Sequence, residues 1–435
     1  MKKFISMLLC TILLLSLCAC SKEEKTQDMN KAPEGKVLVG FGRVVLSPNP
    51  NKQVSLTGYE GNGTPPTPMA GKLIDVCGTC IAITDTKGET ALIFTVDTIF
   101  TTEEEVNGIR AAIKQKTGVT NVVVSATHTH ASMKYQDILD YDNQMAKAAA
   151  DALADRAPAT VQTGSTDIEG MNFVRLYMTK NGIVIGENCD QAVTDSNPIV
   201  SHVSEPDKQM QMIRFLREGK KKDVLMLNWQ AHPFVSSTGW TSVGRGQRAL
   251  LSSDFVGFCR EYIEANSDCM VAYYSGACGN LNPLSRFPEE RKLYSEQVKE
   301  YGDELGKRVL DAMGGLKDQS VGDVVVDQQH LPVNPIPGRG SDTLEITAIR
   351  VGDIGFATVP FEMFDTNGKQ IKEKSTCETT FVLTCASMPK HSYIPSQEVW
   401  DYNTGDQVCY ELNSSKHQRG TAEQVADALA EMLNQ

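Results

Sequence analysis

Two histidines stand one residue apart where an apolar strand is expected to end, in the motif THTH at residues 127–130. The chain contains seven histidines, and a β-branched run at residues 121–126 leads into this pair. Alternate side chains of an extended chain point the same way, so His128 and His130 are expected to share one side. They could bind one metal ion together, or one could bind the metal while the other transfers protons. The alternative is a pair of hydrogen-bonding loop histidines, and further ligands elsewhere in the chain would decide between these readings.

Three other residues could supply such ligands. His232 follows an apolar run at residues 224–229, Glu362 follows another at 354–359, and Tyr393 lies in a polar loop with the sequence HSYIP. Taken singly, these residues are more simply explained as a packed histidine, a carboxylate favoured by a helix dipole and an aromatic loop anchor, respectively. No single motif therefore defines a site.

The elements that must position these residues follow an α/β pattern, in which apolar β-branched runs alternate with amphipathic helical runs. Several candidate residues fall just after predicted strands, where α/β folds tend to place their sites. A hairpin turns at Asn181-Gly182. The predicted strands cover residues 91–96, 122–126, 174–178, 182–185, 211–217, 224–229, 270–274, 323–326, 344–351, 354–359 and 380–384. The predicted helices cover residues 102–116, 142–157, 254–265, 289–313, a segment after Phe361, and 421–432.

The composition is that of a globular protein, with 41% hydrophobic and 22% charged residues among 435. No linker or internal repeat divides the region after residue 36, so one domain is expected over residues 37–435. The net charge of −12 argues against nucleic acid as a partner. No basic amphipathic helix is present that would bind a membrane surface.

The N-terminus is expected to be a processing signal. Two lysines precede an apolar stretch at residues 4–17, which is too short to be a spanning helix. The sequence LCAC at residues 17–20 resembles a bacterial lipobox, which implies a signal peptide at residues 1–19 and a lipid on Cys20. Residues 20–36 are polar and are predicted to form a disordered tether. The protein is therefore expected outside the cytoplasmic membrane, anchored by lipid; an ordinary secretory peptide or a retained anchor are the alternatives.

Nine of the twelve cysteines lie beyond the signal region, so at least one thiol has no partner within the chain. Disulfides are common in exported proteins. The CGTC motif at residues 77–80 has the spacing of a redox or zinc-binding pair, but no second motif of this kind accompanies it. A small disulfide or two reduced thiols is the favoured interpretation.

The order of several short motifs resembles the catalytic domain of the neutral/alkaline, non-lysosomal ceramidases. Each motif is loose alone, but their succession spans nearly the whole chain after the tether. The motifs are GFGR at 40–43, TVD at 95–97, THTH at 127–130, NWQAH at 228–232, SDFVG at 253–257, GNLNP at 279–283, PFE at 360–362 and a tyrosine-rich loop ending at Tyr410-Glu411. The resemblance implies mixed β-sheets flanked by helices, in a single ceramidase-like domain.

The resemblance also implies a site. Zinc would be held by His128, His232, Glu362 and Tyr393, with the tyrosine a weaker or conditional ligand. Two imidazoles and a carboxylate form a sound catalytic zinc set. Four further residues take catalytic roles in this comparison, namely His130 beside the zinc ligands, Arg175 for developing negative charge, Tyr410 in the pocket wall, and Ser275.

Two departures from the family pattern bear on the substrate. The family's Gln-Ser-Asn serine falls on Gly276 in an ungapped comparison, and Ser275 is one position away. The chain also ends soon after the tyrosine-rich loop, so the family's C-terminal immunoglobulin-like domain is not expected. The resulting hypothesis is a zinc-dependent hydrolase of an N-acyl amide, with a ceramide-like lipid as one substrate. A zinc hydrolase of another ester or amide, such as a cell-wall or glycan N-acyl group, and a non-catalytic metal- or ligand-binding lipoprotein are the alternatives.

Overall fold

The computed structural model describes residues 30–58, 67–187, 189–219, 221–238, 240–241, 244–245, 249–287, 289–291, 293–402 and 409–435. Residues Lys31–Gln435 form one compact unit, as expected for a single domain. The predicted signal peptide and Cys20 lie outside the described residues. None of the helices described is both long and apolar enough for a membrane crossing.

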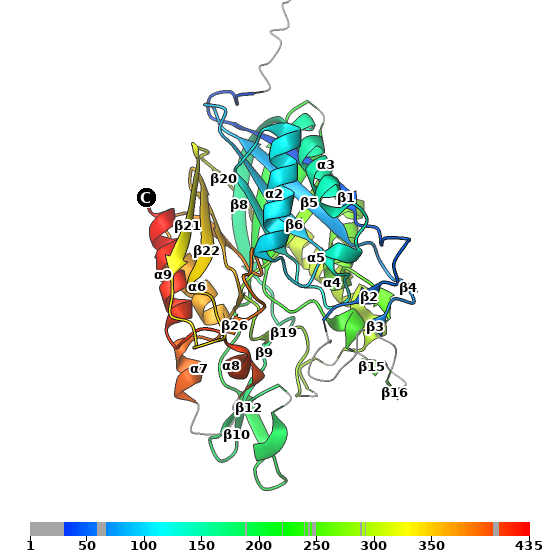
Figure 1. The fold of residues 1–435 in the computed structure, drawn as a ribbon, viewed down its shortest axis with the longest axis vertical. Coiled ribbons are helices and arrows are strands. Elements are labelled where there is room, and N and C mark those ends of the chain that lie inside the picture. The colour runs from blue at the N-terminus through cyan, green and yellow to red at the C-terminus, as the bar shows by residue number, and fades with distance from the viewer. Residues whose placement is uncertain are drawn as a thin grey trace, which may run out of the picture. The chain divides into compact units, whose positions relative to one another are not determined.

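A large mixed sheet forms the centre of this unit (Figure 1). Most neighbouring strands are antiparallel, but β6 pairs in parallel with β7, and β14 pairs in parallel with β18. In spatial order the strands are β18 (Cys269–Ser275), β14 (Asp223–Trp229), β13 (Gln209–Arg217), β8 (Ala157–Asp167), β1 (Val37–Val45), β5 (Cys77–Thr84), β6 (Thr90–Val96) and β7 (Val122–Ala126), with β20 (Lys317–Gln319) beside β8.

A second sheet packs against one face of the large sheet. Its strands, in order, are β21 (Val324–Pro332), β22 (Thr343–Val351), β23 (Ile354–Thr358) and β25 (Thr379–Leu383). Successive side chains of a strand point to opposite faces, so Ile81 and Ile93 of the large sheet belong to the same buried cluster as Phe356 of the second sheet, whereas Cys80 and Phe94 face the other way. Burial of both faces explains why the strands are almost continuously apolar.

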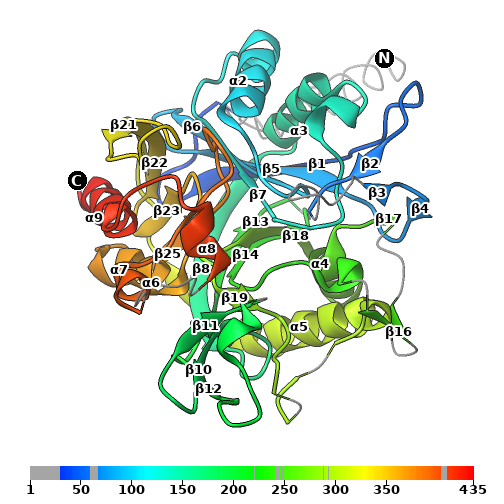
Figure 2. The same cartoon turned by 60° about the horizontal axis from the view of Figure 1, so that its bottom comes forward.

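Helices cover the two outer faces of this pair of sheets. On the large sheet lie α2 (Glu103–Thr117), α3 (Tyr141–Ala154), α4 (Asp254–Asn266) and α5 (Val298–Ala312). On the second sheet lie α6 (Asp365–Lys374) and α9 (Thr421–Leu433). Figures 1 and 2 show these two groups of helices on opposite sides of the strands. The mixed α/β architecture with helix-flanked sheets is thus confirmed.

The two edges of the large sheet meet near the ends of their strands. The Thr95 hydroxyl of β6 donates to the Tyr273 carbonyl of β18 at 2.7 Å. The Ser275 hydroxyl at the end of β18 donates to the carbonyl of Thr127, just beyond β7, at 2.6 Å. The carboxyl ends of the two parallel pairs, far apart in sheet order, are therefore brought to one place. Loops that leave these strands share that place.

The predicted helices and strands agree with the structure for most elements, and the hairpin at Gly182 joins β10 (Leu176–Thr179) to β11 (Val184–Gly186). The helix predicted at 289–313 is shorter, because Val298 begins α5 and the segment before it bonds to loops, as when Arg291 Nε donates to the Gly170 carbonyl at 2.8 Å. The helix predicted at 142–157 ends at Ala154, since residue 157 already belongs to β8.

The folded unit also begins before the predicted end of the tether. Ala32 is buried, and its backbone N–H donates to the Asp85 carbonyl at 2.9 Å.

The two cysteines of the CGTC motif, Cys77 and Cys80, lie three positions apart on β5 and so point to opposite faces of the sheet. Both are free thiols, as are the other cysteines of the described residues.

Candidate metal centre

His128 and His130 lie beyond the end of β7, in a turn and not in an extended strand. His128 has a backbone φ of 70°, in the left-handed region that few non-glycine residues adopt. Its N–H donates to the Thr98 carbonyl at 2.9 Å, and the N–H of His130 donates to the Pro233 carbonyl at 3.0 Å. The two rings still meet edge to face, with centroids 4.9 Å apart. They converge as the sequence predicted, but through this turn and not through strand alternation.

The loop after β18 positions His232, the second histidine proposed as a ligand, although His232 itself lies in another loop. His232 follows the end of β14, and its N–H donates to the carbonyl of Leu281 at 3.0 Å. Leu281 and Asn282 form a short strand, β19 (Leu281–Asn282), that pairs with β9 (Phe173–Val174) and so brings Arg175 to the same loop. The GNLNP motif thus links His232 to Arg175.

Glu362 and Tyr393 come from two short strands that pair in parallel, β24 (Glu362–Met363) and β26 (Tyr393–Ile394). The two residues are direct partners in the register. Gly279 packs against β24, and a Cβ atom at this position would lie 2.7 Å from the Glu362 carbonyl oxygen. A glycine at 279 therefore allows the loop after β18 to approach the strand that carries the carboxylate.

Backbone carbonyls fix the tautomer of both buried histidines. Nδ1 of His128 lies 2.5 Å from the Ile99 carbonyl oxygen, and Nδ1 of His232 lies 2.7 Å from that of Cys278. A carbonyl oxygen can only accept, so each Nδ1 carries a proton, and in the neutral form of each ring Nε2 is the atom with a lone pair. Histidines that bind metal in proteins are commonly oriented by such a bond from the other ring nitrogen.

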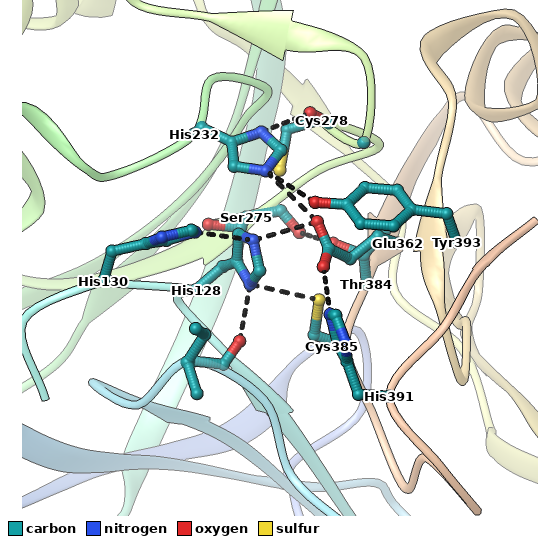
Figure 3. A network of polar contacts seen from close by, with 12 residues as sticks. His128, His130, His232, Ser275, Cys278, Glu362, Thr384, Cys385, His391 and Tyr393 are labelled. Carbon is teal, nitrogen blue, oxygen red and sulfur yellow. Dashed lines mark hydrogen bonds and ion pairs between the residues drawn. The ribbon is translucent and has the colours of Figure 1, made fainter. Parts of the chain in front are cut away.

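The free lone pairs all point to one place (Figure 3). Oε2 of Glu362 lies 3.0 Å from Nε2 of His128 and 3.1 Å from Nε2 of His232. Nε2 of His128 lies in turn 3.3 Å from Nε2 of His130. Acceptor atoms at these distances repel unless a proton or a cation lies between them. The three histidines offer ligand atoms within 4.8 Å of one another, so the donor set fits a metal ion.

The charge states also suit metal binding. Burial, followed by the neighbouring Arg175 guanidinium, lowers the pKa of His232 to about 3, and burial likewise lowers the pKa of His130. Burial alone would raise the pKa of Glu362, but when the histidines that face it carry a proton, their charge and donated hydrogen bonds, that of His391 included, hold it well below its usual range. Neutral imidazoles beside an ionised carboxylate are the forms in which these groups ligate. Because His130 is also close, both roles anticipated for it, ligand and proton acceptor, stay open.

Arg175 and the tyrosines border this centre. Nη1 of Arg175 lies 3.4 Å from Nε2 of His232, and Nη2 donates to the Tyr393 hydroxyl at 3.2 Å. The Tyr393 and Tyr410 hydroxyls are 3.5 Å apart. Burial raises the pKa of Tyr393 well above its usual value, so the side chain is a neutral phenol and the weakest of the four proposed ligands. The structure brings together all the predicted ligands, with Arg175 and Tyr410 at their edge.

Ser275 lies beneath the centre. It is 1% exposed, and its hydroxyl donates to the carbonyl of Thr127, the residue before His128. A side chain at position 276 would point toward Gln230, because a Cβ atom there would lie 2.7 Å from Oε1 of that residue. Of the two positions considered for the family serine, only 275 touches the histidine turn, and it does so through the backbone. A catalytic role for Ser275 stays a prediction.

Two contacts at this centre were not predicted from the sequence. His391 donates from Nε2 to Oε1 of Glu362 at 2.6 Å. Glu411 accepts from Nε of Arg175 at 2.8 Å, and this ion pair is buried on both sides. Both residues lie in motifs noted above, HSYIP and Tyr410-Glu411, but nothing in their spacing indicates a partner so distant in sequence. Only the pairing of β24 with β26 and the docking of α8 (Tyr410–Ser414) reveal them.

Comparison with known proteins supports the fold. No protein-family model and no curated protein sequence matches this chain. A solved structure described as "Ceramidase complexed with C2" superimposes with a TM-score of 0.72 at 13% identity, covering 92% of this chain and 75% of the other. The neutral ceramidase from Pseudomonas aeruginosa gives a TM-score of 0.71 at 14% identity, with coverages of 92% and 74%.

These likenesses define the class of the chain as a mixed α/β protein. More particularly, the described unit has the neutral ceramidase-like fold that the order of motifs predicted.

Proposed function

We propose that this protein is a zinc-dependent hydrolase that cleaves an N-acyl amide, and that His128, His232 and Glu362 hold the metal with Tyr393 as a conditional fourth ligand. The observation that carries the proposal is the convergence of two tautomer-fixed Nε2 atoms on one carboxylate oxygen, at 3.0 and 3.1 Å. A set of three protein ligands leaves a coordination position open for water or substrate. The ceramidase-like fold is consistent with a lipid or small-molecule acyl substrate.

Zinc bound here would supply a water of pKa about 7 and a Lewis acid for the substrate carbonyl. The surrounding residues divide the remaining work. His130, neutral and beside His128, accepts or returns a proton. Arg175 offers a permanent positive charge next to the centre, where negative charge develops on the acyl oxygen. The Tyr410 hydroxyl, 3.5 Å from that of Tyr393, is placed to donate a hydrogen bond to the same oxygen.

The cellular setting belongs to the same proposal. The lipobox-like LCAC sequence supports a lipid on Cys20, which would anchor the protein to the outer side of the bacterial cell membrane. Such a position gives access to membrane lipids and to cell-wall or glycan N-acyl groups alike. A mass measurement of the mature protein tests the anchor, because Cys20→Ala would abolish the added lipid.

Metal analysis of the purified protein is the first test. About one zinc per chain is expected, and none after His128→Ala combined with His232→Ala. His330→Ala is the matched control, because this exposed histidine lies on β21 and should leave the zinc content unchanged. A wild-type protein that binds no zinc would refute the proposed activity.

A release assay then tests the substrate. Liberated amine is measured from N-acyl sphingosines and from N-acyl amino sugars under the same conditions. Turnover of the sphingosines alone would assign the substrate to ceramide-like lipids, and turnover of the sugars alone would assign it to glycan amides. Stoichiometric zinc without turnover of any acyl substrate would favour a binding protein, a role consistent with the hydroxyl of Ser275 being bonded to the backbone.

A further inference from the structure

Glu362 presents its two oxygens to different partners. Oε2 faces His128 and His232, whereas Oε1 accepts a hydrogen bond from Nε2 of His391 at 2.6 Å. An ionised carboxylate only accepts, so the ring nitrogen of His391 carries the proton in this bond. His391 thereby holds one oxygen of Glu362 away from the histidine pair.

The ring of His391 is itself held in place. It stacks on Phe100, with centroids 5.2 Å apart and planes 22° from parallel, and meets the Tyr393 ring edge to face at 5.9 Å. The His391 side chain is 43% exposed, while Glu362 is 1% exposed. His391 is thus the partner of the buried carboxylate that remains open to solvent.

His391 also lines a cavity of about 400 Å³. His391, Phe100 and Ile99 line it together with Glu105 and Met133. The Ile99 carbonyl is also the group that fixes the tautomer of His128. Two hydrogen bonds that orient the proposed ligands, one to His128 and one to Glu362, therefore originate on the wall of a single cavity.

We propose that His391 is a positioning residue of the metal centre, which orients Glu362 so that a single oxygen, Oε2, serves the metal. The inference rests on the proposed function, since it concerns how this chain prepares a ligand. Removal of the Oε1 partner leaves a buried carboxylate oxygen without its hydrogen bond and free to rotate. Outer hydrogen bonds of this kind are typically worth about 10- to 100-fold in metal affinity.

The test is the zinc affinity of the metal-free full-length protein, measured by competition with a chromogenic chelator. His391→Ala is expected to weaken zinc binding by about 10- to 100-fold. His391→Gln is expected to restore most of the affinity, because its side-chain amide N–H can donate to Oε1. His330→Ala serves as the control for loss of a histidine remote from the centre. Thermal unfolding of each metal-free variant checks that the fold is retained.

The outcomes are separable. Equal zinc affinity of the wild type and His391→Ala would overturn this inference while leaving the proposed function intact. Equal weakening by His391→Ala and His391→Gln would also overturn it, since a role of the ring in packing alone predicts that result. A wild type that fails to bind zinc would refute both the proposed function and this inference.

Discussion

Glu362 and Tyr393 are direct register partners in the parallel pair of β24 and β26, and the Glu362 N–H donates to the carbonyl of Ser392 at 3.0 Å. Each strand is only two residues long, and neither is positioned by its own hydrophobic pattern. Their position depends on neighbours, chiefly the loop after β18. The position of the carboxylate in the candidate metal centre is therefore set by backbone contacts between segments that are distant in sequence.

Gly279→Ala tests this dependence. A Cβ at 279 would lie 2.7 Å from the Glu362 carbonyl oxygen and 2.9 Å from that of Met363, both backbone atoms that cannot simply rotate away. We expect a loss of about 1–3 kcal/mol in the free energy of unfolding, together with weaker zinc binding. Denaturant titration and chelator competition measure the two effects. Gly314→Ala is the matched control, because nothing lies within 4 Å of its added methyl group; equal behaviour of the two variants would contradict the packing argument.

Zinc should stabilise the folded state through mass action. At a free zinc concentration of 100 times the dissociation constant, binding to the native state alone adds about 2.7 kcal/mol to the free energy of unfolding. The wild type should therefore melt at a higher temperature with zinc than with a chelator, in scanning calorimetry. His232→Ala removes a proposed ligand and should melt at the same temperature under both conditions. A zinc-dependent rise that persists in His232→Ala would place the ion elsewhere.

The sequence predicts which residues meet at the candidate metal centre better than it predicts the backbone turn and hydrogen bonds that hold them there. Apolar runs mark the strands whose ends carry His128, His232 and Glu362, so these candidates could be found by pattern. The left-handed turn at His128, however, depends on contacts with Thr98, and no periodicity encodes it. The hydrogen bond from His391 to Glu362 arises in the same way, from tertiary contact alone.

The strands missed by the sequence analysis have a physical reason too. β1, with the sequence VLVGFGRVV, is interrupted by glycines that disrupt a strand pattern. Those glycines are needed because α3 lies directly on β1, and a Cβ at Gly40 or Gly42 would overlap the carbonyl oxygens of Ala152 and Ala148. The glycines that let α3 approach the sheet are therefore also the reason why strand propensity does not predict β1.

Arg175 has both a structural and an electrostatic role, which double substitution can separate. Arg175→Met removes the charge beside His232 and leaves Glu411, which is 0% exposed, without its ion-pair partner. Loss of one member of a buried pair typically costs about 3–5 kcal/mol of stability. Adding Glu411→Gln removes the uncompensated charge and should recover part of that loss. Hydrolysis should stay low in both variants; recovery of activity with stability would show that Arg175 acts only in folding.

Glu105 should make stability depend on pH near neutrality. Its side chain completes the capping box of α2 by accepting a hydrogen bond from the Thr102 N–H at 2.6 Å. Glu105 also lines the cavity that His391 lines. Burial raises the pKa of Glu105 from 4.5 to about 7, against the opposing effect of the hydrogen bonds from Thr102 and with added repulsion from Glu104 and Asp142. The folded state therefore binds the proton more tightly than the unfolded state does.

The protonation of Glu105 therefore contributes fully to the free energy of unfolding below pH 4.5. This contribution falls as the pH rises to about 7 and is absent above that pH. The difference corresponds to at most roughly 3 kcal/mol. Glu105→Gln keeps an acceptor for the Thr102 N–H but cannot ionise, so its advantage over the wild type should grow across this range. Denaturant titrations from pH 4.5 to 8 measure it, with Glu261→Gln, at an exposed position on α4, as control. A constant difference between Glu105→Gln and the wild type at all these pH values would show that Glu105 is ionised throughout.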